Sequence, residues 1–258
     1  MGVLNVTPDS FSDGGQHLAF DAAITQAKKM INQGADMIDI GGESTRPGAQ
    51  AVSVEQELAR VIPILKALKS ELDIPISVDT SKAEVMTQAL AAGTDMINDV
   101  CALQNPGTLE AVADSQSQLC LMHMQGSPRT MQENPQYTDV VTDIKRFFET
   151  RLEACTRSGI DSARVVLDPG FGFGKTLEHN IEILQRFEEF KTFGLPLLAG
   201  LSRKSMIGAM LGNREVDGRA TGSVIGAIIA LNNGADIVRV HDVLATKDAI
   251  DIWGKING

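Results

Sequence analysis

The chain has 258 residues, of which 43% are hydrophobic, and a formal net charge of −10. This apolar content is ample for a large core, whereas the acidic balance argues against nucleic acid or an anionic membrane as a partner, because no basic stripe is present to release counterions from phosphates. We see no secretory leader and no apolar span of about 18 residues, so we expect a soluble, cytoplasmic protein. Three widely spaced cysteines predict reduced, buried thiols: Cys101, Cys120 and Cys155.

Short aliphatic runs alternate eight times with helix-patterned stretches along the chain. The predicted strands are Gly2–Asn5, Met37–Gly41, Ile74–Asp79, Met96–Asn98, Leu119–His123, Val165–Asp168, Leu197–Leu201 and Ile237–His241. The predicted helices are Ala19–Gln33, Val54–Leu72, Ala83–Ala92, Thr108–Asp114, Val140–Arg157, Glu178–Phe190, Ala220–Asn233 and Leu244–Lys255. This alternation indicates parallel βαβ units, and eight of them in about 250 residues are typical of one closed barrel. We therefore predict a single (β/α)8 TIM-barrel domain over residues 1–258.

The connections on the two sides of this barrel differ. Gly34–Asp36, Gly93–Asp95 and Gly234–Asp236 each precede a strand, which predicts a recurring structural turn at the bottom of the barrel. Asn5–Gly15 and Gly42–Ser53 follow the first two strands and are long and rich in Gly, Pro, Asp and Ser, as is typical of lids or binding loops. Active sites of this fold lie where strands end and the following loops begin, so polar residues there are the candidates.

The end of the first strand offers hard oxygen ligands. Asn5, Thr7 and Asp9 follow one another closely in a loop that also contains Pro8. Oxygen ligands suit Mg²⁺, which keeps several waters and relies on one or two protein groups together with substrate phosphates. The alternative is an ordinary solvated turn, shaped by its proline and glycines. Asn5, Thr7 and Asp9 are therefore candidate ligands for Mg²⁺.

Three later strands each end on a polar side chain. Asp79, Asn98 and Asp168 close the third, fourth and sixth predicted strands and should point into the barrel mouth from an apolar wall. Two carboxylates and a carboxamide that converge there form a set of acceptors and donors suited to a flat heterocycle bearing an amidine or guanidine group. Strand alternation should turn the neighbouring Asp39 and Asp99 to the opposite side, so we interpret these two as structural.

The segment Gly170–Thr176 is rich in glycine and contains a Gly-Lys-Thr sequence, but it is not a phosphate-binding P-loop. A Walker A motif requires four residues between its first glycine and Gly-Lys, and this segment has three. A loop that frames a flat ligand, with Phe173 as a stacking wall, is the better interpretation. The histidines in the remainder of the chain show no metal-ligand spacing, although His123 is expected to line the mouth; they are His17, His123 and His179.

Basic residues gather after the last two strands. Ser202–Ser205 follows the seventh strand, and Arg239 and His241 alternate onto one face of the eighth. Loops after strands 7 and 8 are the recurrent phosphate site of this fold, so Lys204, Arg239 and His241 predict an anion site; ordinary surface cations are the alternative. Arg46, in the loop after the second strand, can join them.

Seven motifs together closely resemble the dihydropteroate synthases of folate biosynthesis, a family of pterin-binding barrels. They are Asn5–Gly15, Gly42–Gly48, Val78–Thr80, Ile97–Val100, Asp168–Lys175, Ser202–Ser205 and Arg239–Asp242. The first two are long and specific, and the resemblance runs from Met1 to the last helix. Family members usually carry a segment ahead of the first strand, so we expect residues to be missing ahead of Met1.

The resemblance implies condensation of 6-hydroxymethyl-7,8-dihydropterin diphosphate with 4-aminobenzoate, giving 7,8-dihydropteroate and diphosphate, by a Mg²⁺-dependent homodimer that sulfonamides inhibit. The implied pterin-binding residues are Asp79, Asn98, Asp168 and Lys204, with Met122 and Phe173 as apolar walls. The implied diphosphate-binding residues are Asn5, Thr45, Arg46, Arg239 and His241, and Asn5 is also the implied Mg²⁺ ligand. The implied aminobenzoate-binding residues are Phe11, Pro47 and Ser202. Asp79, Asp168, Lys204 and Arg46 are implied to be catalytic.

Two alternatives remain on the sequence alone. A methyltetrahydrofolate-dependent methyltransferase would share the polar residues of strands 3, 4 and 6, but would not need the Ser44–Gly48 loop or the pair of Arg239 and His241. An inactive pterin-binding paralogue would be expected to carry damage in one of the two long loops, and none is visible. Turnover of the synthase substrates separates the three possibilities.

Overall fold

The computed structural model describes residues 1–7, 16–44, 51–127 and 130–257. Phe11, Thr45, Arg46 and Pro47, which we predicted to bind substrate, lie outside the described residues, as does Asp9. The strands are β1 (Gly2–Asn5), β2 (Ile38–Gly41), β3 (Ile76–Asp79), β4 (Met96–Asp99), β5 (Gln118–Met122), β6 (Val165–Asp168), β7 (Leu198–Ala199) and β8 (Ile237–Val238). The helices are α1 (Gln16–Asn32), α2 (Val54–Glu71), α3 (Ala83–Ala91), α4 (Thr108–Ala113), α5 (Val140–Arg157), α6 (Leu177–Gln185), α7 (Ser205–Met210), α8 (Ala220–Asn232) and α9 (Val243–Asn257).

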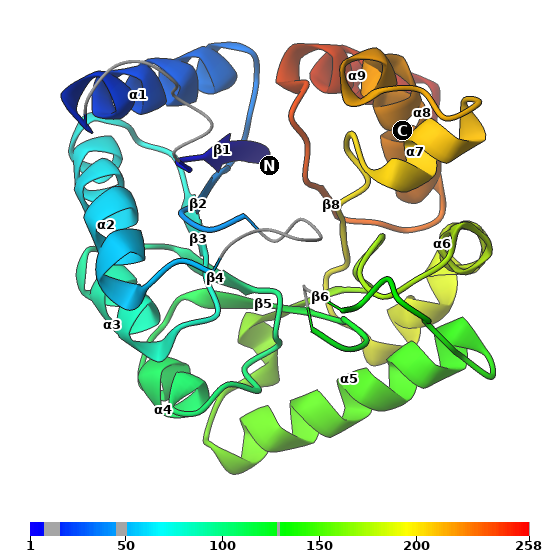
Figure 1. Cartoon of the computed structure of the whole chain (residues 1–258), viewed down its shortest axis with the longest axis horizontal. Coiled ribbons are helices and arrows are strands. Elements are labelled where there is room, and N and C mark those ends of the chain that lie inside the picture. The colour runs from blue at the N-terminus through cyan, green and yellow to red at the C-terminus, as the bar shows by residue number, and fades with distance from the viewer. Residues whose placement is uncertain (8–15, 45–50, 128–129, 258) are drawn as a thin grey trace.

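The strands form a ring with the helices outside it, as Figure 1 shows. Strands β1 to β6 pair in parallel in chain order, and β7 pairs with β8. Single parallel bridges, Leu167 with Leu197 and Gly2 with Val240, join the two groups of strands. At the second junction the Met1 ammonium also donates to the Val238 carbonyl at 3.0 Å. The predicted order of strands and helices is thereby confirmed, with every neighbour parallel.

The turns at the bottom of the barrel help to set its register. Asp95 directly precedes β4 and accepts the backbone N–H of Ile76, the first residue of β3, at 2.7 Å. Asp236 precedes β8 and accepts the N–H of Leu197, just ahead of β7, at 2.9 Å. In two of the three predicted Gly-X-Asp turns, the aspartate therefore holds the start of the preceding strand, which supports the structural role expected of them.

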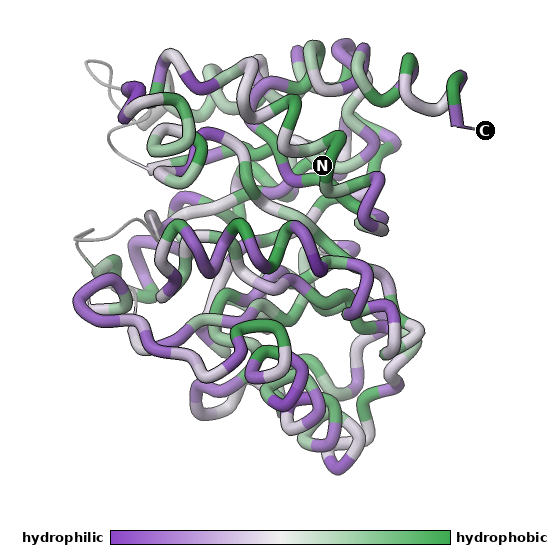
Figure 2. Tube along the Cα trace, turned by 90° about the vertical axis from the view of Figure 1, so that its right-hand side faces the viewer, coloured by the Kyte–Doolittle hydropathy of each residue, from purple (hydrophilic) through white to green (hydrophobic). Residues whose placement is uncertain are grey.

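The barrel has an apolar layer between strands and helices and a second one inside its lower end. The larger layer packs the helices on the outside of the sheet, and the tubes in Figure 2 alternate between apolar and polar segments along the helices accordingly. The inner layer consists of Met96, Cys120, Val166 and Leu198, with Met1, Met37 and Ile237 packed against it. Two residues further along most of these strands, the inward-facing residue is polar or is a glycine. The interior of the barrel therefore changes from apolar to polar toward the mouth.

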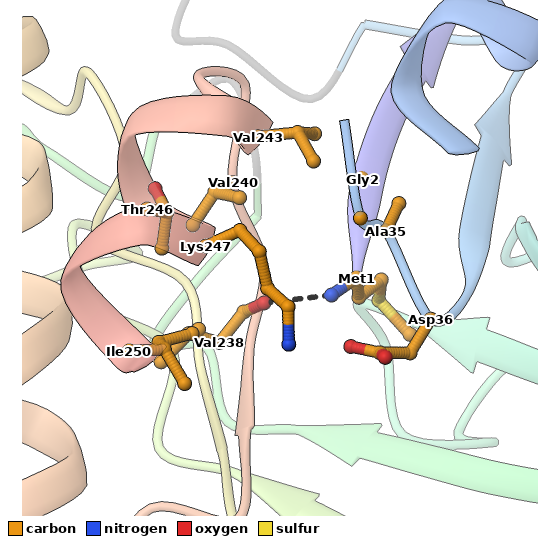
Figure 3. Close-up of a pocket in the computed structure, with 11 residues that line it drawn as sticks. Met1, Gly2, Ala35, Asp36, Val238, Val240, Val243, Thr246, Lys247 and Ile250 are labelled. Carbon is orange, nitrogen blue, oxygen red and sulfur yellow. Dashed lines mark hydrogen bonds between the residues drawn. The ribbon is translucent and has the colours of Figure 1, made fainter. Parts of the chain in front are cut away.

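A small pocket opens at the bottom of the barrel, between β1, β8 and α9. Its walls include Gly2, Asp36, Val243 and Lys247, as Figure 3 shows. The cavity has a volume of about 30 Å³, which is room for a water or two. It lies at the opposite end of the strands from the polar residues described below.

The predicted helices match most closely where the apolar periodicity is long. The predicted helix Val140–Arg157 is α5 without change. The stretch predicted as Glu178–Phe190 is divided, since α6 ends at Gln185 and a 3₁₀ segment, Phe187–Phe193, follows it. Helix α7 was not predicted, because six residues are too few to show a helical period. Two further 3₁₀ segments, Ser162–Arg164 and Val216–Arg219, also went unpredicted.

Candidate active site

The polar residues at the strand ends are neighbours across the sheet. In the register of the barrel, Asn5 lies beside Gly41, Gly41 beside Asp79, and Asp79 beside Asn98. Gly41 has no side chain, and a Cβ built there would stand 3.6 Å from Asn5 Oδ1 and 3.8 Å from Asp79 Oδ2. Both oxygens therefore border the space that a side chain on β2 would have filled, which brings the predicted metal ligand and the predicted pterin ligand together.

Arg239, which follows β8, bridges two carboxylates inside the mouth. Its Nη2 donates to Asp79 Oδ2 at 2.8 Å, and its Nε donates to Asp39 Oδ2 at 2.6 Å. Asn98 also donates to that Asp39 oxygen, at 3.2 Å. The prediction that Asp39 faces away from the interior was therefore wrong: Asp39 and Gly41 are the inward residues of β2, and the absent side chain of Gly41 hid this alternation. Asp39 acts structurally, but from within the barrel, where it positions two predicted substrate-binding residues.

The charge of this network alters the acidity of its members. Burial raises the pKa of Asp79 to about 7; Arg239 opposes the shift, and the nearby Asp39 adds to it. Two carboxylates share one guanidinium, so the attraction of Arg239 does not offset the loss of water around Asp79. The same carboxylates raise the pKa of Arg239 and keep it charged. A buried carboxylate that titrates near neutrality is typical of a functional site.

Asp168 lies across the mouth from this pair, at the end of β6. Its Oδ1 accepts the N–H of Gly170 at 2.8 Å, and a Cβ built on Gly200 of the seventh unit would stand 3.9 Å from its Oδ2. Burial raises the pKa of Asp168, while the positive charge of Lys204 acts against that shift. Burial in turn lowers the pKa of Lys204 to about 8, opposed by Asp168. Asp168 is buried and Lys204 is half-buried, and the pKa values of the two groups are moved toward each other.

An apolar wall stands beside Lys204. Phe173 packs with Val100, Met122 and Met131 in a separate buried cluster. Lys204 Nζ lies 4.3 Å from the centroid of the Phe173 ring and donates to the carbonyl of Phe171. The structure therefore brings the predicted wall residues Met122 and Phe173 together, next to a cation and within reach of a flat ligand's face.

The groups after β7 and β8 lie against each other. The Ser202 hydroxyl is 3.0 Å from His241 Nδ1 and also accepts the His241 backbone N–H at 3.1 Å. Arg203, at a positive φ of 59°, forms a two-pronged ion pair with Asp242 through bonds of 3.0 and 2.6 Å. These bonds fix the two loops to each other, and they place Ser202 beside His241 on the predicted diphosphate side. Its predicted role toward aminobenzoate stays a prediction.

Two residues that the sequence did not single out hold the base of the second loop. The Glu43 carboxylate accepts the N–H of Val52 at 3.1 Å. This bond joins the chain before residues 45–50 to the chain after them. Lys82, just before α3, pairs with Glu43 and with the buried Glu57 of α2. No pattern in the sequence flags this cluster, because Glu43 and Glu57 lie far apart within the second unit and Lys82 belongs to the third. Asp99, in contrast, accepts the N–H groups of Cys101 and Leu103, both at 2.8 Å, so its predicted structural role is confirmed.

The donor set at β1 and β2 fits Mg²⁺ only as a site completed by a ligand. Among the described residues, no group of three or more His, Cys, Asp or Glu side chains could hold a metal ion. Asn5 offers one neutral oxygen beside the open space at Gly41. A single weak oxygen ligand suits an ion that keeps its waters and takes its remaining ligands from a substrate phosphate.

The chain belongs to a family of barrel enzymes that bind pterins: the family described as pterin binding enzyme matches residues 1–241. Its curated relatives identify the branch of this family to which the chain belongs. The dihydropteroate synthase of Haemophilus influenzae is 52% identical over 253 residues, covering 98% of this chain and 92% of that protein. The enzyme of the same name from Escherichia coli is 52% identical over 252 residues, covering 98% and 89%. The chain is thus a member of the dihydropteroate synthases, a family of transferases.

Solved structures agree with this assignment. The chain is similar to Yersinia pestis dihydropteroate synthase in complex with a sulfonamide drug, with a TM-score of 0.94 and 52% identity over 100% of this chain and 93% of that one. A Xanthomonas albilineans dihydropteroate synthase with 4-aminobenzoic acid gives a TM-score of 0.94 at 48% identity, covering 100% and 92%. A structure of the X. albilineans enzyme with 7,8-dihydropteroate gives 0.91 at 45%, covering 100% and 93%. These neighbours confirm the predicted TIM-barrel fold.

Proposed function

We propose that the mouth of this barrel condenses 6-hydroxymethyl-7,8-dihydropterin diphosphate with 4-aminobenzoate, and that the predicted residues play the roles assigned to them above. The observation that carries this proposal is the convergence of Asp79, Asn98 and Asp168 on one mouth together with Lys204 and Arg239. Acidic groups suit the N–H edge of a pterin, and cations suit a diphosphate. The two kinds of group lie side by side, which supports cleavage of the bond between the pterin methylene carbon and its diphosphate oxygen at this mouth.

The proposed reaction begins with cleavage of the bond between the pterin methylene carbon and the diphosphate oxygen. The electron pair leaves with diphosphate, whose charge Arg46, Arg239 and His241 would stabilise. The pterin-methyl cation that remains is stabilised by the carboxylates of Asp79 and Asp168, which are fixed in advance by their bonds to Arg239 and Gly170. The amine of 4-aminobenzoate then forms the new C–N bond and loses a proton to solvent or to departing diphosphate.

Mg²⁺ would be held by Asn5 and by the diphosphate, and when bound it supplies positive charge that favours departure of the leaving group. The open space at Gly41 beside Asn5 Oδ1 supports this placement.

A diphosphate-release assay tests the proposed reaction. We expect release from the pterin diphosphate to depend on 4-aminobenzoate at steady state and to match 7,8-dihydropteroate formation one for one. Failure to form dihydropteroate from the two substrates would contradict the proposal. The same assay tests inhibition: we propose that sulfonamides compete with 4-aminobenzoate once the pterin diphosphate site is occupied, in line with the drug complex of the Y. pestis relative. Non-competitive inhibition by sulfamethoxazole would contradict that placement.

We also propose that the protein is a homodimer that pairs through α7, α8 and α9. The large hydrophobic side chains most exposed in the described part of the chain all lie on these helices and on the 3₁₀ segment between α7 and α8. They are Met210, Val216, Ile225, Ile229, Leu244, Ile252 and Ile256. Clustered apolar exposure of this kind marks a protein interface more often than a solvated surface.

Substitution of Ile225, which is 56% exposed, by Glu tests the dimer. We expect sedimentation to show a dimer for the unaltered protein and a monomer for Ile225→Glu. Lys145→Glu on α5 serves as a control at a distant surface. A monomer in the unaltered protein would contradict this proposal.

A cytoplasmic location is the final part of the proposal. No helix in the described ranges is long and apolar enough to cross a bilayer. All three cysteines are free thiols, and two of them are buried, as suits a reducing compartment.

A further inference from the structure

Lys175 places its amine inside the protein, and neither the predicted nor the family-implied site uses it. It is 3% exposed. Its Nζ lies 2.9 Å from His123 Nδ1, 2.9 Å from the Gly170 carbonyl and 3.0 Å from the Phe173 carbonyl. The His123 carbonyl is a fourth acceptor, at 3.3 Å, so every proton of the amine has a partner. A buried amine with partners on every side is held firmly in place, and loss of the amine would leave its acceptors without a donor.

The surroundings of His123 favour a ring nitrogen that accepts a hydrogen bond from that amine. It follows β5, is buried, and packs edge-on against Phe147 with ring centroids 4.9 Å apart. Burial and the charge of Lys175 hold the pKa of His123 well below its usual range. The uncharged ring then carries its proton on Nε2 and presents the Nδ1 lone pair to Lys175. His123 thus connects the end of β5 to the amine at the far end of the β6 loop.

The loop that Lys175 holds is pressed closely against the β5 segment. A Cβ on Gly170, where φ is +72°, would stand 2.0 Å from the His123 carbonyl oxygen. A Cβ on Gly174, where φ is +63°, would stand 2.4 Å from the Gln125 carbonyl oxygen. Both conformations suit glycine, and both contacts leave no space for a side chain. The loop can therefore lie so close to the segment after β5 that the Lys175 amine reaches the carbonyls of both Gly170 and Phe173.

This turn carries the groups that face Lys204. Its Phe173 ring lies under Lys204 Nζ, and its Phe171 carbonyl accepts a hydrogen bond from the same amine. Its first glycine donates to Asp168. We propose that Lys175, together with His123, is a positioning residue for the pterin half of the site: it fixes the Gly170–Phe173 turn and, through that turn, the wall, the cation and the carboxylate that receive the pterin. This inference rests on the function proposed above.

A purely structural lysine would affect all kinetic constants alike, whereas a positioning residue affects the pterin side selectively. We compare Lys175→Met, which keeps the length of the chain and removes the amine, with Lys69→Met. Lys69 pairs with Asp95 at the bottom of the barrel, with N–O distances of 3.0 and 3.3 Å, so its loss removes a lysine contact far from the mouth. Binding of 6-hydroxymethylpterin is measured by fluorescence, and KM is measured for each substrate.

We expect Lys175→Met to weaken pterin binding and to lower kcat/KM for the pterin diphosphate on the order of tenfold to a hundredfold, as misplacement of a site by an ångström does. The KM for 4-aminobenzoate at saturating pterin diphosphate should stay within about twofold. Lys69→Met should leave all of these constants near those of the unaltered protein. Equal changes in the constants for both substrates, or unchanged pterin binding in folded Lys175→Met, would overturn the inference.

A second pair of variants keeps the test valid if Lys175→Met does not fold. Asn Oδ1 occupies the position of His Nδ1 relative to the backbone, and a Leu Cδ occupies it without a lone pair. We therefore expect His123→Asn to bind pterin more tightly than His123→Leu, and equal affinities would contradict the inference. Failure of the unaltered protein to form dihydropteroate would remove the proposed function as well, whereas normal turnover with normal pterin binding in the variants would remove this inference alone.

Discussion

The two ends of the barrel interior are built from the same strands but from opposite kinds of residue. Met96 of β4 and Val166 of β6 belong to the apolar layer at the bottom. Two residues further along the same strands, Asn98 and Asp168 face the mouth. A strand alternates with a period of two, so each strand contributes to both layers through consecutive inward positions. Within one strand, the inward residue at the bottom of the barrel thus contributes to stability, and the inward residue at the mouth contributes to the proposed chemistry.

The largest expected effect concerns the bottom layer and falls on stability. Met96 is fully buried, so Met96→Ala should lower the free energy of unfolding by about 2–5 kcal/mol, as the loss of a large core side chain usually does. The kcat of the folded fraction should change little. Chemical denaturation and initial rates under folding conditions measure the two quantities. A loss of kcat in Met96→Ala as large as that in Asn98→Ala would show that the two layers are not separable.

The next effect concerns the mouth and falls on activity. Asp79→Asn and Asp168→Asn should each keep the fold and lose about 1.5–3 kcal/mol of transition-state stabilisation, because each removes a charged acceptor from a desolvated site. This corresponds to a decrease in kcat/KM of roughly tenfold to more than a hundredfold. Asp99→Asn controls for loss of a carboxylate charge near the mouth, since the hydrogen bonds of Asp99 in the described part of the chain go to two backbone N–H groups of the turn after β4. Near-normal turnover in either mouth variant would refute its assignment.

The pH dependence of activity should also come from the mouth. The pKa of Asp79 is raised to about 7, so its carboxylate becomes ionised as the pH rises through that value. The pKa of Lys204 is lowered to about 8, so its positive charge is lost above that pH. We expect kcat/KM for the pterin diphosphate to rise toward pH 7 and fall above pH 8, changing about tenfold per pH unit on each limb. In Asp79→Asn the acid limb should disappear; a limb that persists would assign it to another group.

The smallest effect is expected from removal of metal. EDTA should weaken binding of the pterin diphosphate, whereas binding of a pterin without phosphates and the thermal midpoint of unfolding should not change. The reason is that Asn5 alone supplies one weak oxygen, so the metal depends on the diphosphate. Calorimetry that detects tight Mg²⁺ binding to the free protein would contradict this dependence.

The sequence predicted the barrel well because its signals are local. An apolar run, a polar residue at its end and a periodic helix recur in each unit, and the strand ends therefore identified Asp79, Asn98 and Asp168. The parts that were missed depend on contacts between units. Asp39 was assigned to the wrong face because the next inward residue, Gly41, has no side chain to reveal the alternation. The pairing of Lys175 with His123 joins residues 52 positions apart and leaves no periodic signal.

The close packing of Gly170 and Gly174 against β5 has a consequence for how this enzyme can evolve. A methyl group at either position would meet a carbonyl oxygen of the neighbouring strand's continuation, so a single substitution there cannot adjust the pterin pocket by a small step. Substitutions at these glycines that weaken binding of an inhibitor confined to the pterin wall would therefore also destabilise the fold. Selection by a drug would act more readily on residues whose side chains have room to change, and resistance would arise away from these glycines.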